Sequence, residues 1–130
     1  DHEHEQWFAS LNERKESELH FAIETTPDSR HIGNIWLRNI HARHRKAEIS
    51  VLIGRSDSLS KGMGSEAISL LSRYASETLS LHRLYAHVLA FNERARKAFE
   101  KAGFELEGTL RSDRLSSEDY VDVHILGKLA

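Results

Sequence analysis

The sequence contains no cysteine and only one proline in 130 residues. Without cysteine the chain has no disulfide, no thiolate metal site and no cysteine nucleophile, and a reducing cytoplasm is the expected compartment. Any thiol in its chemistry has to come from a bound molecule. The scarcity of proline, together with 39% hydrophobic residues, excludes a proline-rich linker and predicts a single folded domain over residues 1–130.

Long hydrophobic runs and an excess of one charge are also missing. No stretch approaches the roughly 18 consecutive apolar residues that span a bilayer, and the opening DHEHEQ is too polar for a signal peptide. The 18 Lys and Arg residues against 20 Asp and Glu give a formal net charge of -2. A nucleic acid or an anionic membrane attracts a clustered excess of basic residues, so we expect neither as a partner.

The spacing of apolar residues predicts a mixed α+β fold in three layers. Trp7, Phe8 and Leu11 fall on one helical face of residues 5–16, which predicts a short first helix. Alternating and helical patterns then follow one another along the chain. The elements predicted after the first helix are strands over residues 19–26, 32–40 and 47–54, a helix over 65–80, a strand over 84–91, a helix over 92–103 and a β-hairpin over 104–129.

The loop SKGMG, residues 60–64, connects an apolar strand to the longer of these helices. Free N–H groups at a helix N-terminus favour an anion, and glycines let the backbone approach a phosphate closely. The alternative is an ordinary glycine turn between a strand and a helix. Neither GxxxxGK[ST] nor GxGxxG is present, so this loop does not match the common nucleotide-binding motifs.

Three motifs in register point to a known family. Glu48 on its strand, SKGMGSEA at a helix start and NERARKAFEKAGF after the next strand resemble, in order and spacing, the GNAT superfamily of acetyl-CoA-dependent N-acetyltransferases. With its closing hairpin, the chain is most similar to the branch typified by ribosomal-protein N-terminal acetyltransferases. The resemblance covers residues 5–129. It implies a central, mostly antiparallel sheet with splayed parallel strands and flanking helices, here without the family's first strand and helix.

The resemblance also implies where the ligand lies. It implies acetyl-CoA as cosubstrate and no metal. The pantetheine arm would lie between the splayed strands, with a backbone N–H near Leu52 or Ile53 facing the oxyanion and Asn92 touching the arm. Asn92 is equally well explained as a helix N-cap, and both roles are compatible. The residues implied to bind the pyrophosphate are Ser60, Lys61, Gly62, Met63, Gly64 and Ser65.

Glu48 is the candidate general base, because several family members carry theirs at this spacing from the loop. Acetyl transfer needs an uncharged amine, a stabilised oxyanion and a proton for the leaving thiolate. Partial burial is expected to raise the pKa of Glu48 toward a useful range. The alternative is a structural carboxylate paired with an arginine such as Arg43 or Arg45.

Two positions depart from the family pattern. Leu59 stands where the phosphate loop usually starts with Gln or Arg, which backbone binding tolerates. Phe99 stands where many members have a tyrosine that protonates the thiolate. Helical spacing assigns Phe99 to packing, so the proton has to come from water, from Ser50 or from Tyr85, unless the thiolate leaves unprotonated.

The histidines suggest no metal site. The run HARHRK, residues 41–46, is best explained as a solvated hairpin loop. His87, and His124 with Asp122, are expected to be ordinary sheet residues, with a place in the acceptor pocket as the alternative. The terminal His2-Glu3-His4 has no later partner at a suitable spacing.

These observations predict an N-acetyltransferase that moves an acetyl group to a primary amine by direct attack. The acceptor is either a small-molecule amine or a protein N-terminus, and a homodimer is an open alternative to a monomer. The competing hypothesis is a non-catalytic acyl-CoA-binding or interaction module with a degenerate site. In that module Phe99 would replace the tyrosine that acts as the general acid. A nucleic-acid binder is least favoured because the net charge is negative.

Overall fold

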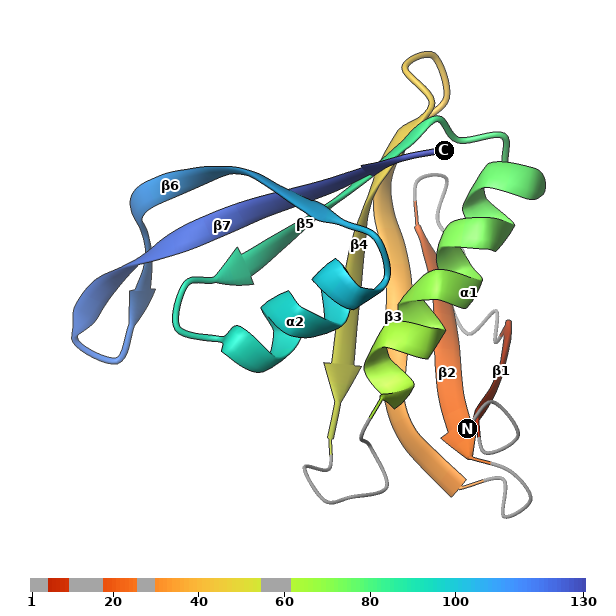
Figure 1. The fold of residues 1–130 in the computed structure, drawn as a ribbon, viewed down its shortest axis with the longest axis horizontal. Helices are drawn as coiled ribbons and strands as arrows, with labels where there is room; N and C mark the ends of the chain where they lie inside the picture. Colours follow the sequence, from red (N-terminus) through yellow and green to blue (C-terminus); the bar gives the residue numbers. More distant parts are fainter. Residues whose placement is uncertain (1–4, 10–17, 26–29, 55–61) are drawn as a thin grey trace.

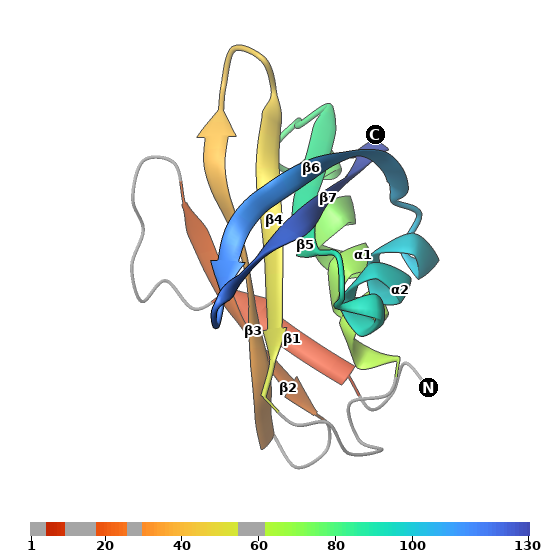
Figure 2. The same ribbon diagram turned by 90° about the vertical axis from the view of Figure 1, so that its left-hand side faces the viewer.

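In a computed structural model, the chain forms one seven-stranded mixed sheet with two helices on the same face (Figures 1 and 2). The structure describes residues 5–9, 18–25, 30–54 and 62–130. The strands are β1 (Glu5–Ala9), β2 (Leu19–Thr25), β3 (Arg30–His41), β4 (Lys46–Ile53), β5 (Arg83–Leu89), β6 (Glu105–Ser116) and β7 (Asp119–Leu129), and the helices are α1 (Met63–Glu77) and α2 (Glu93–Lys101). Their order in the sheet is β1-β2-β3-β4-β5-β7-β6, which confirms the α+β class.

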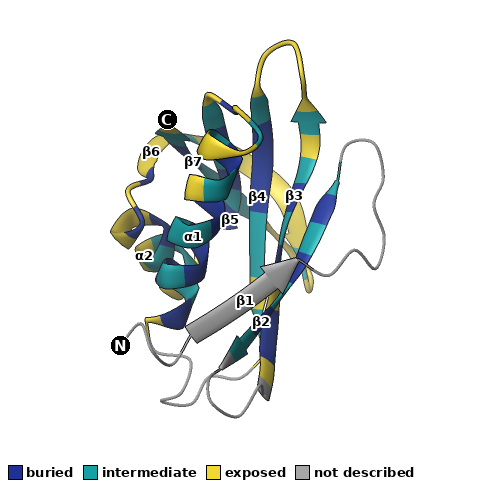
Figure 3. Cartoon of the chain, turned by 90° about the vertical axis from the view of Figure 1, so that its right-hand side faces the viewer, coloured by how far each residue is buried: buried dark blue, intermediate teal, exposed yellow. Residues whose placement is uncertain are grey.

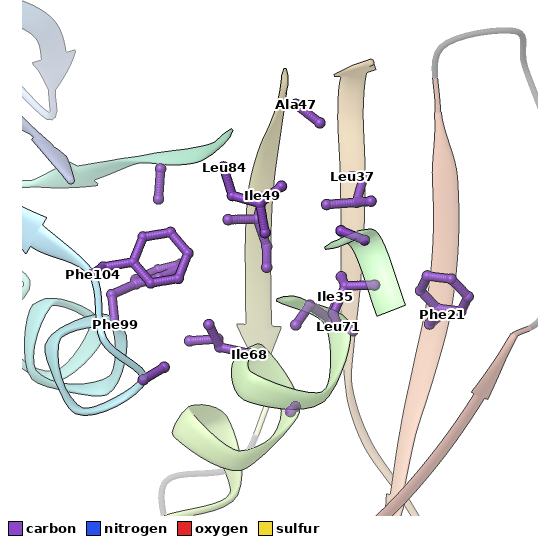
Figure 4. Packing of buried hydrophobic residues seen from close by; sticks show 14 of the residues in the cluster. Phe21, Ile35, Leu37, Ala47, Ile49, Ile68, Leu71, Leu84, Phe99 and Phe104 are labelled. Atoms are coloured by element: carbon purple, nitrogen blue, oxygen red, sulfur yellow. The ribbon is translucent and has the colours of Figure 1, made fainter. Parts of the chain in front are cut away.

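The three predicted strands after the first segment form the antiparallel meander β2-β3-β4. Leu37 is in register with Ile49, and both side chains are fully buried beneath the helices. Ile68 and Leu71 of α1 pack against this face (Figure 4). Since side chains alternate along a strand, the residues between these core positions point to the other face of the sheet. Glu48 is one of them.

The first predicted element is wrong. Residues 5–9 form strand β1, with Trp7 in register with Ile23 of β2, where the spacing predicted a helix. Three apolar residues in a short segment fit either a helix or a strand. The edge of β2 favours the strand, because its backbone N–H and C=O groups form hydrogen bonds with those of the added strand. Leu11 lies outside the described residues.

The connection β4-α1-β5 makes β4 and β5 parallel neighbours, as predicted. They are paired at only three consecutive positions, from Lys46 with Arg83 to Glu48 with Tyr85. Beyond Tyr85, β5 continues in register with β7, while β4 stays paired with β3. The two strands therefore separate after Glu48, and Figure 1 shows their ends pointing in different directions.

Helix α2 begins at the predicted N-cap and ends at a glycine. The Asn92 side chain accepts a hydrogen bond of 3.1 Å from the Ala95 N–H, which caps the first turn. Gly103 follows the helix at φ +99°, a conformation that glycine adopts without strain. Phe99 is buried and meets Phe104 edge to face at 5.1 Å between ring centroids (Figure 4), which confirms its packing role.

The remaining surface agrees with the sequence patterns. The HARHRK turn between β3 and β4 is solvent-exposed, as predicted, apart from its last residue (Figure 3). The closing hairpin β6-β7 is also confirmed. No helix in the described part of the chain is long and apolar enough to cross a membrane.

Truncating Leu71 should destabilise the chain by about 2–5 kcal/mol, because Leu71→Ala leaves a cavity between α1 and the sheet. Leu71 is fully buried, whereas Leu129 at the end of β7 is 61% exposed. The matched control Leu129→Ala should stay within about 0.5 kcal/mol of wild type. Urea unfolding monitored by circular dichroism measures both, and equal effects would contradict the assignment of the core.

Candidate functional site

Glu48 occupies the point where β4 and β5 separate. Its position is the last that pairs with β5, and its side chain lies on the sheet face opposite the helices. Only 4% of the residue is exposed. Burying a carboxylate is costly unless it is paired and hydrogen-bonded, so its contacts decide whether it is charged.

Three side chains surround the Glu48 carboxylate. Arg38 of β3 donates from Nη2 to Oε2 at 3.1 Å, and Nδ1 of His87 on β5 lies 2.9 Å from the same oxygen. Asn39 donates from Nδ2 to Oε1 at 3.3 Å. The carboxylate is thus held by residues from both neighbouring strands.

An irregularity in β3 lets two consecutive residues reach Glu48. The register of β3 and β4 shifts between Arg38 and His41, and Asn39 adopts φ +55°. In a regular strand Arg38 and Asn39 would point to opposite faces. A bulge re-aims a side chain, and asparagine tolerates the left-handed conformation better than most residues. The bulge therefore brings the Asn39 amide within hydrogen-bond distance of the Glu48 carboxylate.

The pKa of Glu48 is lowered, contrary to the expectation from burial. Desolvation raises the pKa, but the hydrogen bonds from Arg38 and His87, together with their charges, outweigh it. The carboxylate therefore stays ionised at neutral pH. The arginine partner is Arg38, not Arg43 or Arg45, which are exposed in the β3-β4 turn.

Tyr85 lies beside this cluster on β5. Burial, and then the negative charge of Glu48, raise the pKa of its phenol, although a hydrogen bond with Asn39 opposes them. The hydroxyl therefore remains protonated at neutral pH. Its ring meets His87 edge to face at 5.9 Å between centroids. Tyr85, weighed from the sequence as a proton source, is adjacent to the carboxylate.

Gly62 is the N-cap residue of α1. This residue has φ +80°, and no described side chain caps the helix. A Cβ added to Gly62 would meet no described atom within 4 Å, whereas one added to Gly64 would lie 3.7 Å from Cβ of Ala98. Among the described residues, nothing therefore crowds Gly62, and Gly64 lies where α1 meets α2, at a distance that a Cβ would turn into an ordinary contact. Ser60 and Lys61 lie outside the described residues.

The remaining predicted ligand contacts lie toward the end of β4 and at the starts of α1 and α2. Leu52 is 60% exposed near the end of β4, and Ile53 packs partly against the core next to Gly64. Ser65 is buried, and its hydroxyl donates to the Gly62 carbonyl at 3.1 Å. The Asn92 amide is occupied as a cap. Met63 begins α1 and belongs to the core.

The other histidine candidates lie outside this cluster. His124 contacts Thr109 at 2.8 Å, and Asp122 accepts a hydrogen bond from the Ser112 N–H, so both are paired within the β6-β7 hairpin. His2 and His4 lie outside the described residues. Where the chain is described, no group of three or more His, Asp or Glu side chains is placed to hold a metal ion.

Sequence reasoning missed Arg38 and Asn39 as partners of Glu48. Arg38 is directly opposite Glu48 in the β3-β4 register, a pairing that the predicted hairpin could have supplied. Asn39 reaches the carboxylate only because of the bulge, which leaves no clear mark in the sequence. His87 was named, but its contact with Glu48 depends on how the two strands diverge.

Comparison with known proteins identifies the family. A model of the acetyltransferase (GNAT) domain matches residues 1–105. The chain belongs to the GNAT acetyltransferase family. It is 36% identical over 100 residues to the probable N-acetyltransferase YjcK of Bacillus subtilis, covering 76% of this chain and 55% of that protein. It is 31% identical over 105 residues to the spermidine N(1)-acetyltransferase of Escherichia coli K12, covering 81% and 55%.

A solved structure of the same family supports the fold. The spermidine N-acetyltransferase from Vibrio cholerae, in complex with CoA and spermine, superimposes with a TM-score of 0.80 at 30% identity, covering 88% of this chain and 66% of that one. The GNAT resemblance and fold predicted from the motifs are thus confirmed. The chain spans only about half the length of the curated relatives that it matches.

The lowered pKa of Glu48 predicts a pH-dependent stability for this GNAT chain. Because the folded-state pKa is depressed, the stabilisation is present above the unfolded-state pKa and is lost as the pH falls through the folded-state value. The free energy of unfolding should therefore decrease more steeply below about pH 4.5 in wild type than in Glu48→Gln.

Urea unfolding at a series of acidic pH values tests this difference. Glu105→Gln, at the exposed start of β6, is the matched control and should follow the wild-type curve. If wild type and Glu48→Gln give parallel curves, the pKa of Glu48 is not lowered by folding.

Proposed function

We propose that this chain is an acetyl-CoA-dependent N-acetyltransferase that moves an acetyl group to a primary amine by direct attack. The observation that carries the proposal is the ionised Glu48 at the point where β4 and β5 separate. Membership of the GNAT family supports the same reaction.

The residues present fit acetyl-CoA. The N-terminus of α1 at Gly62 offers backbone N–H groups to a pyrophosphate, and the edge of β4 beyond Glu48 is not paired with β5. When bound, acetyl-CoA supplies an activated thioester carbonyl. The residues proposed to hold it remain those predicted from the sequence, namely Leu52, Ile53, Ser60, Lys61, Gly62, Met63, Gly64, Ser65 and Asn92.

Glu48 is proposed to act at the amine side of this site. Its role as general base stays a prediction. Phe99 does not supply the leaving-group proton, because a phenyl ring has no proton to donate, and its ring packs in the core against Phe104. Tyr85 carries a protonated hydroxyl and interacts with Glu48 and Asn39. Of the proton donors considered from the sequence, we therefore propose Tyr85.

The acceptor that we propose to test first is a polyamine. Two relatives with a named substrate, from Escherichia coli and Vibrio cholerae, are spermidine N-acetyltransferases. The ribosomal-protein N-terminal branch, and with it a protein N-terminus as acceptor, stays a prediction from the closing hairpin.

Self-association is a further part of the proposal. One solved spermidine N-acetyltransferase from Vibrio cholerae is described as dodecameric. In this chain Leu115 and Tyr120 are in register on the β6-β7 hairpin and are both more than 60% exposed. A contiguous exposed apolar patch indicates an interface, and we propose that these two neighbouring side chains belong to one.

Gly62→Asn should weaken acetyl-CoA binding by about tenfold or more, or roughly 1.4 kcal/mol. Asparagine tolerates a positive φ, so the fold should survive, while its side chain would enter the space next to the helix N-terminus. Gly108→Asn on β6, where an added Cβ also meets nothing within 4 Å, is the matched control. Unchanged affinity in calorimetry would remove the ligand from this loop.

Glu48→Gln should lower turnover on amines by about a hundredfold or more. The assay measures thiol release from acetyl-CoA with a panel that includes spermidine, spermine and a peptide with a free N-terminus. The deficit should shrink at high pH, where the amine loses its proton unaided. Wild-type turnover in Glu48→Gln would make this carboxylate structural, and no turnover in wild type would favour the non-catalytic binding module.

A further inference from the structure

We propose that Nε2 of His87 accepts the proton of the attacking amine, and that Glu48 is the positioning residue that orients the imidazole. This inference rests on the proposed acetyltransferase function and deepens it. It changes the expected division of roles, because the sequence assigned the proton transfer to Glu48 and treated His87 as an ordinary sheet residue.

The hydrogen bond to Glu48 determines which nitrogen of His87 can accept a proton. Nδ1 lies 2.9 Å from Oε2 of Glu48. An ionised carboxylate can only accept hydrogen bonds, so Nδ1 carries the hydrogen in this pair. In the neutral imidazole the lone pair is then on Nε2. Orientation of a histidine by a buried carboxylate is the logic of a catalytic triad.

The lone pairs of Glu48 are already largely used. Oε2 interacts with both Arg38 and His87, and Oε1 accepts from Asn39. In the described part of the chain, Nε2 of His87 has no such partner. The His87 side chain is 25% exposed, against 6% for that of Glu48. The histidine is therefore the more accessible proton acceptor of the pair.

The position of His87 suits this role. It lies two residues beyond Tyr85, the last residue of β5 that pairs with β4, so its side chain bridges the two strands where they separate. The charged or titratable groups that face it are Glu48 from β4, Arg38 from β3 and Tyr85 from its own strand. On the other side, its register partner on β7 is the apolar Ile125.

The proton transfer is balanced without a second acid. The amine reacts as its free base, after its first proton has gone to solvent. As its nitrogen bonds to the acetyl carbon, Nε2 takes a proton from that nitrogen. The carbon–sulfur bond breaks, and the same proton returns from Nε2 to sulfur, directly or through water. The products are an amide and a thiol, and His87 ends neutral, so a hydroxyl at Phe99 is not required.

His87→Asn separates the two functions of the histidine. Asparagine places an N–H close to the position of Nδ1, so the hydrogen bond to Glu48 can persist, but it has no basic nitrogen. We expect turnover to fall by about a hundredfold or more. The acidic limb of the kcat/KM profile should disappear, because asparagine has no basic nitrogen that takes up a proton. Acetyl-CoA affinity measured by calorimetry should remain within about twofold, a change of roughly 0.4 kcal/mol.

Two further variants complete the activity test. His124→Asn, on the neighbouring strand β7, removes a histidine that contacts Thr109 outside the cluster and should keep wild-type turnover. His87→Ala should recover part of its turnover when free imidazole is added, because imidazole then supplies the missing base. It also serves as the test variant if His87→Asn does not fold.

A measurement without turnover tests the geometry in the wild-type chain. Two-bond hydrogen–nitrogen NMR correlations of the neutral histidine ring should show Nδ1 protonated and Nε2 unprotonated. The opposite tautomer would overturn the proposal, because Nε2 would then have no lone pair for the amine proton.

The activity outcomes separate this inference from the proposed function. Turnover in an active wild type that is unchanged in His87→Asn but lost in Glu48→Gln would overturn the inference and leave Glu48 as the direct base. A wild type that binds acetyl-CoA but acetylates no amine would overturn the proposed function, and the role of His87 with it. Loss in His87→Asn, with rescue of His87→Ala by imidazole, supports both.

Discussion

The separation of β4 from β5 is the constraint on which the rest of the site depends. The two strands share only three paired positions, and each then follows a different antiparallel partner. Fully paired strands would leave no strand edge between them for a ligand and would place His87 beside Ser50 rather than across an opening. Because the pairing stops at Glu48, that residue stands at the end of a continuous sheet and at the start of the gap.

A buried carboxylate at this point needs a specific backbone around it. Taking a charge out of water costs several kcal/mol unless good hydrogen bonds compensate. Arg38 and His87 come from the strands on either side, and Asn39 adds a donor through a bulge with a positive φ. Removing any of them leaves the remaining charge poorly satisfied. The cluster therefore acts as one unit, and its geometry is fixed by three strands rather than by a loop.

The sequence predicts the core of this chain better than its site. Alternation in β3 and β4 and helical spacing around Leu71 reflect burial, which is a local pattern repeated along each element. The N-cap at Asn92 and the glycine at 103 are equally local signals. The contact between Glu48 and His87 joins residues far apart in sequence and depends on the angle between two strands. The bulge at Asn39 and the strand β1 likewise depend on a neighbouring strand, not on their own residues.

One face of the sheet forms the hydrophobic core, and the other carries the polar residues of the candidate site. The helix-covered face is apolar, and Phe99 belongs to it, so a hydroxyl there would have to reach the reacting atoms from a packed core. The opposite face carries the polar residues of the same strands, and Glu48, Tyr85 and His87 are all on it. The lack of a tyrosine hydroxyl at position 99, on the helix side, therefore does not by itself remove proton transfer from the site. What matters is whether the polar face holds a group that both takes and returns a proton, and on that face the oriented imidazole is such a group.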